Sequence, residues 1–162
     1  MSKAISIIMG SQSDLETVNE AVNLLKEFKV DFEVKVLSAH RTPKELAEYV
    51  VGSSKKGVKV FIAAAGGAAA LAGVVAAHTV LPVIGIPIET TSLKGMDSLL
   101  STVQMPGGIP VASMAIGKPG AKNAAIFALE ILGINDKAMQ TKLLQYKKEM
   151  RNKIVKAKNI KI

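Results

Sequence analysis

The fold of this chain is first indicated by one segment, Ala4-Ile5-Ser6-Ile7-Ile8-Met9-Gly10-Ser11-Gln12-Ser13-Asp14. Its first six residues are rich in β-branched side chains, which is typical of a short buried strand, and Gly10 ends that strand. Ser13 and Glu16 have the spacing of a capping box. Apolar residues then recur at the helical period, at Leu15, Val18, Val22, Leu25 and Phe28. The segment therefore predicts a strand that leads through a polar turn into a helix.

The same alternation continues to the end of the chain. Further strands are predicted at 32–37, 58–64, 81–88 and 110–116, and Phe32, Val34 and Val36 are expected to face the core. Helices are predicted at 43–52, between Gly67 and His78, at 96–105, at 121–132 and from Asp136 onward. The helix at 43–52 begins in a second capping box, Thr42-Pro43-Lys44-Glu45, with proline in the first helical position. Parallel neighbours need long crossovers, so five such strands imply a parallel sheet covered on both faces.

We therefore predict an α/β fold, a flavodoxin-like three-layer sandwich whose five-stranded parallel sheet has the order 2-1-3-4-5, with an additional C-terminal helix. Residues 1–162 show no repeat or linker and are expected to form a single domain. In this strand order the ligand crevice lies between strands 1 and 3. The loops after the first three strands are therefore the expected functional loops.

Composition excludes several kinds of protein. The sequence has no Cys, which rules out disulfides, thiol nucleophiles and thiolate metal ligands. Two His residues and no clustered carboxylates give no expectation of a metal site. No apolar run reaches the roughly 18 residues of a membrane span, and no basic, apolar leader precedes the first strand. We therefore expect a cytoplasmic location and no membrane partner.

The net charge of +8 comes mostly from one end of the chain. Eight Lys and Arg lie between Lys142 and Lys161, against the single acid Glu149. The only aromatic residue among them is Tyr146, so a nucleic-acid partner is not expected. Residues 136–158 are predicted to form a basic amphipathic helix, either solvated or packed on another subunit. Its apolar stripe favours subunit packing and consists of Met139, Leu143, Tyr146, Met150 and Ile154.

The first functional loop predicts an anion site. Gly10 permits a tight turn, and the hydroxyls of Ser11 and Ser13 beside free helix N–H groups suit a phosphate. Asp14 would repel phosphate and is better suited to accept hydrogen bonds from sugar hydroxyls. The alternative is that Ser13 only caps the helix and Asp14 only complements its dipole.

The second loop contains the residue best suited to proton transfer. Histidine is the residue type that can give or take a proton near neutral pH, which makes His40 the candidate, and Arg41 offers a forked, permanently charged donor for phosphate. The alternative is that Arg41 pairs with a surface acid and His40 bonds the backbone. Ser38 and Ala39 precede them at the strand end.

The third loop, Ala65 to Gly73, lacks the glycine spacing of a dinucleotide fingerprint. Its small residues allow backbone amides to approach a flat ligand, or alternatively allow tight helix–sheet packing. The residues expected to line a pocket are Ala65, Gly66, Ala68, Ala69 and Leu71. His78 falls at the end of the helix that follows, where it is expected to serve the helix C-terminus.

Four segments together resemble the N5-carboxyaminoimidazole ribonucleotide mutase family, the catalytic component of the phosphoribosylaminoimidazole carboxylase step of purine biosynthesis. They are Gly10 to Asp14, Ser38 to Pro43, Val103-Gln104-Met105-Pro106-Gly107-Gly108 and Ala121-Lys122-Asn123-Ala124. The likeness runs in order from about Ile5 to Leu132.

This resemblance implies a single catalytic domain that assembles as a homo-octamer, with sites at subunit junctions and no metal or organic cofactor. It implies transfer of a carboxyl group from the exocyclic nitrogen of the aminoimidazole nucleotide to ring carbon C4. Ser11, Asp14 and Arg41 would hold the phosphoribosyl part, while Ser38 and His40 would line the reacting end. His40 would protonate the exocyclic nitrogen as carbon dioxide leaves, and would then remove the C4 proton.

The third loop departs from the family pattern. The family usually reads Ala-Ala-His-Leu-Pro-Gly here, whereas this chain has Ala70 in place of the His and Ala72 in place of the Pro. Relatives that carboxylate aminoimidazole ribonucleotide directly with carbon dioxide also lack this His, but they usually carry Lys at the position of Arg41. Mutase and direct carboxylase are therefore both open, and Arg41 favours the mutase.

Overall fold

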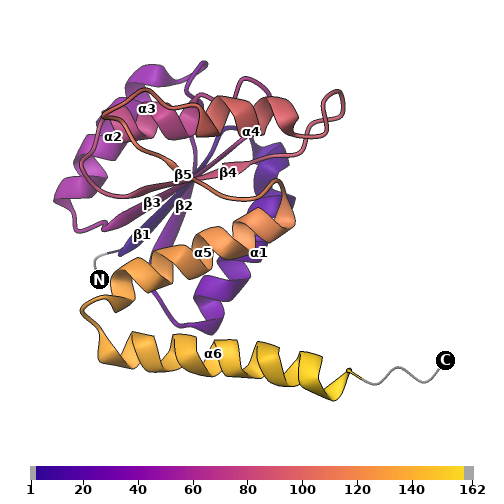
Figure 1. The fold of residues 1–162 in the computed structure, drawn as a ribbon. Helices are drawn as coiled ribbons and strands as arrows, with labels where there is room; N and C mark the ends of the chain where they lie inside the picture. Colours follow the sequence, from indigo (N-terminus) through magenta and orange to yellow (C-terminus); the bar gives the residue numbers. More distant parts are fainter. Residues whose placement is uncertain (1–2, 159–162) are drawn as a thin grey trace. The chain divides into compact units, whose positions relative to one another are not determined.

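The computed structural model describes residues 3–158 and confirms the predicted architecture (Figure 1). Its strands are β1 (Ile5–Met9), β2 (Phe32–Val36), β3 (Val60–Ala65), β4 (Val83–Pro87) and β5 (Ala112–Ser113). They form one parallel sheet in the order β2-β1-β3-β4-β5. The helices are α1 (Leu15–Glu27), α2 (Pro43–Lys55), α3 (Leu71–Ala77), α4 (Met96–Val103), α5 (Lys118–Gly133) and α6 (Lys137–Lys156), with a 3₁₀ turn, η1 (Gln12–Asp14), before α1.

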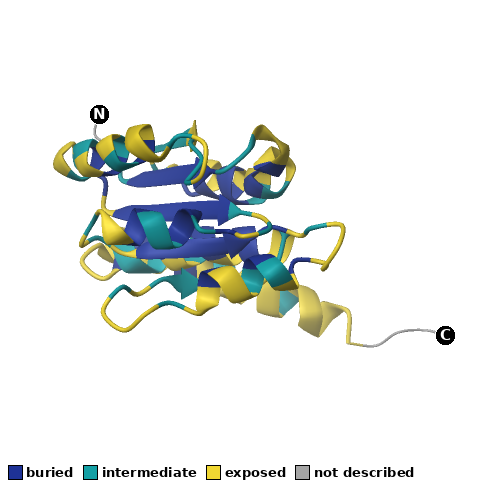
Figure 2. Ribbon diagram, turned by 90° about the horizontal axis from the view of Figure 1, so that it is seen from above, coloured by how far each residue is buried: buried dark blue, intermediate teal, exposed yellow. Residues whose placement is uncertain are grey.

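The chain divides at Ala128 into two compact units. In the first unit, α2, α3 and α4 cover one face of the sheet, and α1 and the first part of α5 cover the other (Figure 1). Burial follows from this layering, because the central strands have neighbours on both faces and both edges. All five residues of β1 and of β4 are buried, and Figure 2 shows these strands as the buried middle layer. The apolar side chains of α2 that reach this core are Leu46 and Val50, both fully buried.

Three local predictions are wrong. Val36 is not a core residue but is 50% exposed, because β2 is an edge strand, whose last two residues are both exposed. The fifth strand has only two paired residues, Ala112 and Ser113, because it is the other edge and pairs with β4 alone. Neither capping box forms: Asp14 and Thr42 occupy the N-cap positions of α1 and α2 without a side-chain cap bond.

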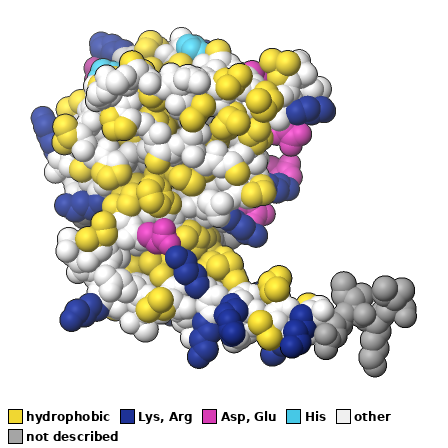
Figure 3. Space-filling model, in the orientation of Figure 1, with side chains coloured by type: hydrophobic (Ala, Val, Ile, Leu, Met, Phe, Trp, Pro, Cys, Tyr) yellow, Lys and Arg dark blue, Asp and Glu magenta, His cyan; other side chains and the backbone are white. Residues whose placement is uncertain are grey.

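The second unit consists of the end of α5 and the helix α6. Asp136 caps α6, since its carboxylate accepts hydrogen bonds from the amides of Ala138 and Met139 at 2.9 and 3.0 Å. Met139 and Leu143 are buried, and both approach Gly133. Figure 3 shows Lys and Arg side chains gathered along α6, as the sequence predicts. No helix among residues 3–158 is long and apolar enough to cross a membrane.

Candidate active site

The loops after β1, β2, β3 and β4 converge on a cavity of about 560 Å³ at the carboxyl edge of the sheet. Its size is that of a small-ligand pocket, roughly 300–1,000 Å³. The residues that line it are Gly10, Ser11, Ser13, Asp14, Ser38, Ala39, His40, Arg41, Ala65, Gly66, Ala70, Leu71, Ile88, Glu89, Thr90 and Thr91. The structure thus brings together ten of the residues predicted for substrate binding, and His40 with them.

The hydroxyl groups of the loop after β1 form hydrogen bonds within the loop itself. Gly10 continues the sheet, because its amide donates to the carbonyl of Ala64 at 3.1 Å. Ser11, rather than Ser13, caps the 3₁₀ turn: its Oγ accepts from the Ser13 amide at 3.3 Å. Ser13 Oγ lies 2.8 Å from Ser11 Oγ and 3.2 Å from Asp14 Oδ1. These hydroxyls are exposed at the cavity and can exchange their mutual bonds for bonds to a ligand.

Asp14 is the one strongly buried acid of the cavity, at 8% exposure. Burial raises the pKa of its carboxyl group, because desolvation penalises the charged form. The Ser13 side chain, the Ser11 backbone and the positive charge of Arg41 act in the opposite direction but do not cancel this effect. A buried carboxylate with unused acceptor capacity is well suited to bind ligand hydroxyls.

The loop after β2 is closed on itself and tied to the loop after β1. The amide of Ser38 donates to Thr42 Oγ1 at 2.8 Å, and the amide of Thr42 donates to the Ser38 carbonyl at 2.9 Å. Arg41 Nη2 donates to the Gly10 carbonyl at 2.7 Å, and Nε lies 3.4 Å from Ser38 Oγ. The guanidinium is therefore oriented before any ligand binds, with other N–H groups left for an anion.

His40 lies between these anchors with its side chain exposed at the cavity. Within residues 3–158 its imidazole makes no hydrogen bond or ion pair, so the alternative of a bond to the backbone is not seen. The described ion pairs do not include Arg41 either, so its pairing with a surface acid is not seen. His78 caps the C-terminus of α3, where its amide donates to the Val75 carbonyl at 3.0 Å, and it does not line this cavity. The structure thus separates the two histidines.

The loop after β3 contributes Ala65, Gly66, Ala70 and Leu71 to the cavity wall. Ala68 is exposed and Ala69 is buried, and neither lines the cavity. Gly67 has a φ of 68°, a conformation that favours glycine, and its amide donates to Ser98 Oγ at 3.0 Å. This turn lies between Gly66, which lines the cavity, and Ala68 and Ala69, which do not.

Sequence reasoning missed the segment Ile88 to Thr91, which follows β4. The amide of Ile88 donates to the Ala65 carbonyl at 2.9 Å, so this segment lies directly beside the loop after β3. Thr90 Oγ1 donates to the Asp97 carboxylate at 2.8 Å. The signal was available, because the carboxyl end of β4 lies at the same sheet edge as the other three.

The ionisable residues of the cavity are Asp14, His40, Arg41 and Glu89. One imidazole, one guanidinium and two carboxylates can bind a ligand that carries both an anion and hydroxyl or amino donors, and the imidazole can transfer a proton. The described residues contain no cluster of three or more His, Asp or Glu that could hold a metal ion.

Comparison with known proteins gives consistent matches along the chain. A family model described as AIR carboxylase matches residues 4–153. The N5-carboxyaminoimidazole ribonucleotide mutase of Saccharolobus solfataricus is 52% identical over 151 residues, which cover 93% of this chain and 94% of that protein. The enzyme of the same name from Bacillus subtilis is 53% identical over 143 residues, 88% of each chain. The crystal structure of Treponema denticola PurE superimposes with a TM-score of 0.86 at 27% identity, covering 94% of both chains.

Proposed function

Because this chain belongs to the AIR carboxylase family, we propose that it catalyses the reaction for which its 50%-identical relatives are named. It converts N5-carboxyaminoimidazole ribonucleotide to 4-carboxy-5-aminoimidazole ribonucleotide in de novo purine biosynthesis. The observation that carries the proposal is the unpartnered imidazole of His40 on the wall of a cavity that also contains Arg41. A nucleotide with one phosphate and two ribose hydroxyls matches the donors and acceptors of that cavity.

In the proposed complex, Arg41 and the hydroxyl of Ser11 bind the phosphoribosyl phosphate, and Asp14 accepts hydrogen bonds from ribose hydroxyls. The guanidinium is already held by the Gly10 carbonyl, so little side-chain entropy is lost on binding. Gly10, Ser13, Ala39, Ala65, Gly66 and Leu71 form the walls around the sugar and base, and Ser38 lies at the reacting end beside His40. Ala68 and Ala69 act only by shaping the turn behind that wall.

Two proton transfers by His40 account for the isomerisation. The imidazolium gives a proton to the exocyclic nitrogen as the bond from nitrogen to the carboxyl carbon breaks, which releases carbon dioxide. Ring carbon C4 then attacks carbon dioxide, and the neutral imidazole removes the C4 proton. The histidine ends in its initial state, and no oxidant, reductant or organic cofactor is needed.

The cavity contributes proximity as well as a proton carrier. Carbon dioxide held beside the ring reacts as if at very high concentration, and exclusion of water limits its loss. Ala70 lines the cavity at the position where the family usually has His. Among the described residues that line the cavity, His40 is therefore the one with an imidazole. The proposed mechanism is accordingly a single-imidazole one.

A substitution of His40 tests the mechanism, with His78 as a matched control in the same chain. We expect His40→Asn to lower kcat by about 10²–10⁴-fold, the usual contribution of general acid–base catalysis. We expect His78→Asn to retain activity, because that side chain is exposed at the C-terminus of α3. Unchanged turnover in His40→Asn would refute the proposed mechanism. Assays with each nucleotide, with and without bicarbonate, test the reaction itself. Turnover only of aminoimidazole ribonucleotide together with carbon dioxide, and not of N5-carboxyaminoimidazole ribonucleotide, would reject the mutase.

We also propose that the protein is a cytoplasmic homo-octamer without nucleic-acid or membrane partners. An apolar stripe on α4 and the turn before it supports a neighbouring subunit, since its residues are about half exposed: Leu93 in the turn (58%), and Met96 (49%), Leu100 (51%) and Val103 (48%) on α4. The same helix is tied to the loop after β3, which supplies part of the cavity wall, because Ser98 Oγ accepts a hydrogen bond from the Gly67 amide. A subunit packed on this stripe would lie close to the cavity.

A further inference from the structure

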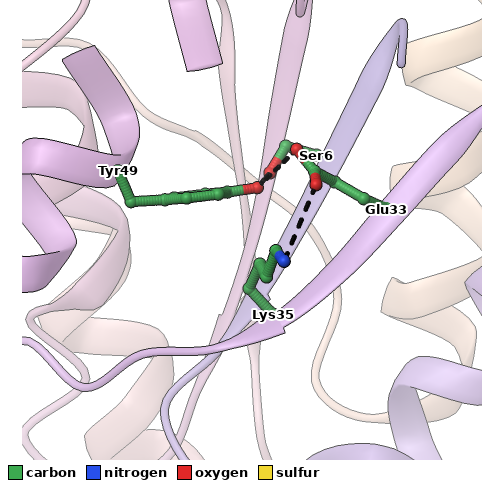
Figure 4. Close-up of polar contacts among 4 residues, drawn as sticks. All are labelled: Ser6, Glu33, Lys35 and Tyr49. Carbon is green, nitrogen blue, oxygen red and sulfur yellow. Dashed lines mark hydrogen bonds and ion pairs between the residues drawn. The ribbon is translucent and has the colours of Figure 1, made fainter. Parts of the chain in front are cut away.

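A polar cluster joins α2, β1 and β2, and the loop that contains His40 connects two of these elements, β2 and α2. The hydroxyl of Tyr49, on α2, donates to Glu33 Oε1 on β2 at 2.7 Å and lies 2.7 Å from Ser6 Oγ on β1 (Figure 4). Ser6 and Glu33 are register partners on neighbouring strands, so one phenol joins both strands to the helix. Lys35 completes the cluster, with Nζ 3.9 Å from Glu33 Oε2 and 6.0 Å from the Tyr49 ring centroid.

The Tyr49 hydroxyl of this cluster stays protonated at neutral pH. Burial, and secondarily the Glu33 carboxylate, raise the pKa of Tyr49 to about 12. The phenol is therefore a permanent donor to Glu33, and its oxygen accepts from Ser6, which is fully buried. Without this oxygen the Ser6 hydroxyl would lose the one bond that the structure gives it.

The cluster specifies where α2 sits, which apolar packing alone does not. Leu46 and Val50 bury the inner face of the helix, but such contacts are non-directional and tolerate small shifts of the helix along the sheet. Two hydrogen bonds at 2.7 Å from one phenol to two strands tolerate much less. Tyr49 therefore fixes the register of α2 against β1 and β2.

The position of α2 is transmitted to His40 over a very short path. Only residues 37–42 connect β2 to α2. Thr42 belongs to both the loop and the helix, since it is bonded to Ser38 and its carbonyl accepts from the Leu46 amide at 3.0 Å. Arg41 has an independent tie to Gly10, whereas the described structure gives the His40 side chain none. A shift of α2 would therefore displace His40 more than Arg41.

We propose that Tyr49 is a positioning residue for His40, acting by holding α2 against the two strands whose loops form the cavity. The inference rests on the proposed function for its kinetic consequence, but its structural part stands apart from it. Misplacement of a reacting group by about 1 Å can cost up to roughly a hundredfold in rate. Tyr49→Phe keeps the ring and removes only the hydroxyl, so we expect about a tenfold lower kcat with an unchanged KM.

Three variants distinguish positioning from general loss of stability. Glu33→Leu removes the acceptor and should reproduce the kcat loss, whereas Glu33→Gln keeps an acceptor oxygen and should largely preserve kcat. Ser54→Ala removes a hydrogen bond to Thr79 from the same helix, at 3.1 Å, and should lower the melting temperature without lowering kcat. Equal kcat in Tyr49→Phe and the wild type, or an equal kcat loss in Ser54→Ala, would overturn the proposal.

Histidine NMR provides a readout that does not depend on turnover. The chain has two His, so ¹³C-histidine spectra resolve one signal from the cavity and one from the end of α3. We expect Tyr49→Phe to shift the His40 signal and to leave the His78 signal unchanged. Ser54 and His78 line the same surface pocket, so Ser54→Ala should shift the His78 signal and leave the His40 signal unchanged. An unmoved His40 signal in Tyr49→Phe refutes positioning. If the wild type is inactive in the assay but Tyr49→Phe still shifts the His40 signal, the proposed function is refuted and the positioning role of Tyr49 is not.

Discussion

At the scale of single residues, the cavity combines a preorganised residue with one whose burial costs folding free energy. Arg41 is held by hydrogen bonds to Gly10 and Ser38, whereas Asp14 is buried with a raised pKa. A raised folded-state pKa means that ionisation of Asp14 costs folding free energy as the pH rises through that pKa. Retaining such a residue beside a cavity is expected where ligand binding, rather than stability, requires it.

Asp14→Asn should therefore stabilise the protein and weaken its binding of substrate. At pH 7 we expect a higher melting temperature, because the variant removes the buried charge but keeps the acceptor for Ser13. The advantage should shrink as the pH falls towards 3.8, where the wild-type carboxyl group also becomes protonated. We expect KM to rise by about tenfold, the loss of one hydrogen bond to a charged group. A lower melting temperature at pH 7, measured by circular dichroism, would contradict this account.

At the scale of helices and strands, the sequence predicts order and type well and edges poorly. The periodic segments 15–27 and 32–36 are found where the pattern places them, because hydrophobic periodicity follows directly from burial. The end of β2, the length of β5 and the caps of α1 and α2 depend on neighbours from distant parts of the sequence. Ser11 caps in place of Ser13 because the chain forms a 3₁₀ turn before α1, which local spacing does not reveal.

The candidate site shows the same limit. Its three predicted loops meet at one cavity because the strand order brings their ends together, and that order follows from a general rule. The part of the wall formed by Ile88 to Thr91 was missed because the rule was applied to three strands rather than four. Which residues of the third loop face the cavity depends on the turn at Gly67, and a run of Ala and Gly does not encode its direction.

Two glycines on helices provide opposite tests of element packing. A Cβ at Gly120, in the first turn of α5, would lie 1.6 Å from the Ala115 carbonyl oxygen, whereas a Cβ at Gly52, in α2, would meet nothing within 4 Å. We expect Gly120→Ala to destabilise the fold by at least about 3 kcal/mol, because backbone must move. Gly52→Ala should stabilise it by about 0.4–1 kcal/mol. Urea unfolding at one protein concentration measures both, and equal midpoints for the two variants would show this packing to be misjudged.

At the scale of the whole molecule, the C-terminal helix has more apolar surface than its own unit covers. Leu144 is 69% exposed and Ile154 is 74% exposed, although Met139 and Leu143 are buried. Of the 20 residues of α6, all within the described range, Met139 and Leu143 are the buried ones, which supports the proposed role of this helix in subunit packing.

A chain that ends after Ile134 should therefore form a smaller assembly, as measured by light scattering. The matched control ends after Lys156, which keeps all of α6 and should keep the size of the full-length protein. An unchanged assembly in the shorter variant would show that α6 does not hold subunits together.

Charge is distributed unequally between the two compact units. Residues 129–162 contain nine Lys and Arg against three Asp and Glu, so they carry +6 of the net +8, and residues 1–128 are almost neutral. An anionic nucleotide that approaches the cavity therefore experiences little long-range attraction from the unit that binds it. Capture depends instead on contacts shorter than the Debye length, about 8 Å at physiological salt. Ionic strength should accordingly affect the proposed association of α6 with a neighbouring subunit far more than the association rate constant of substrate with the cavity.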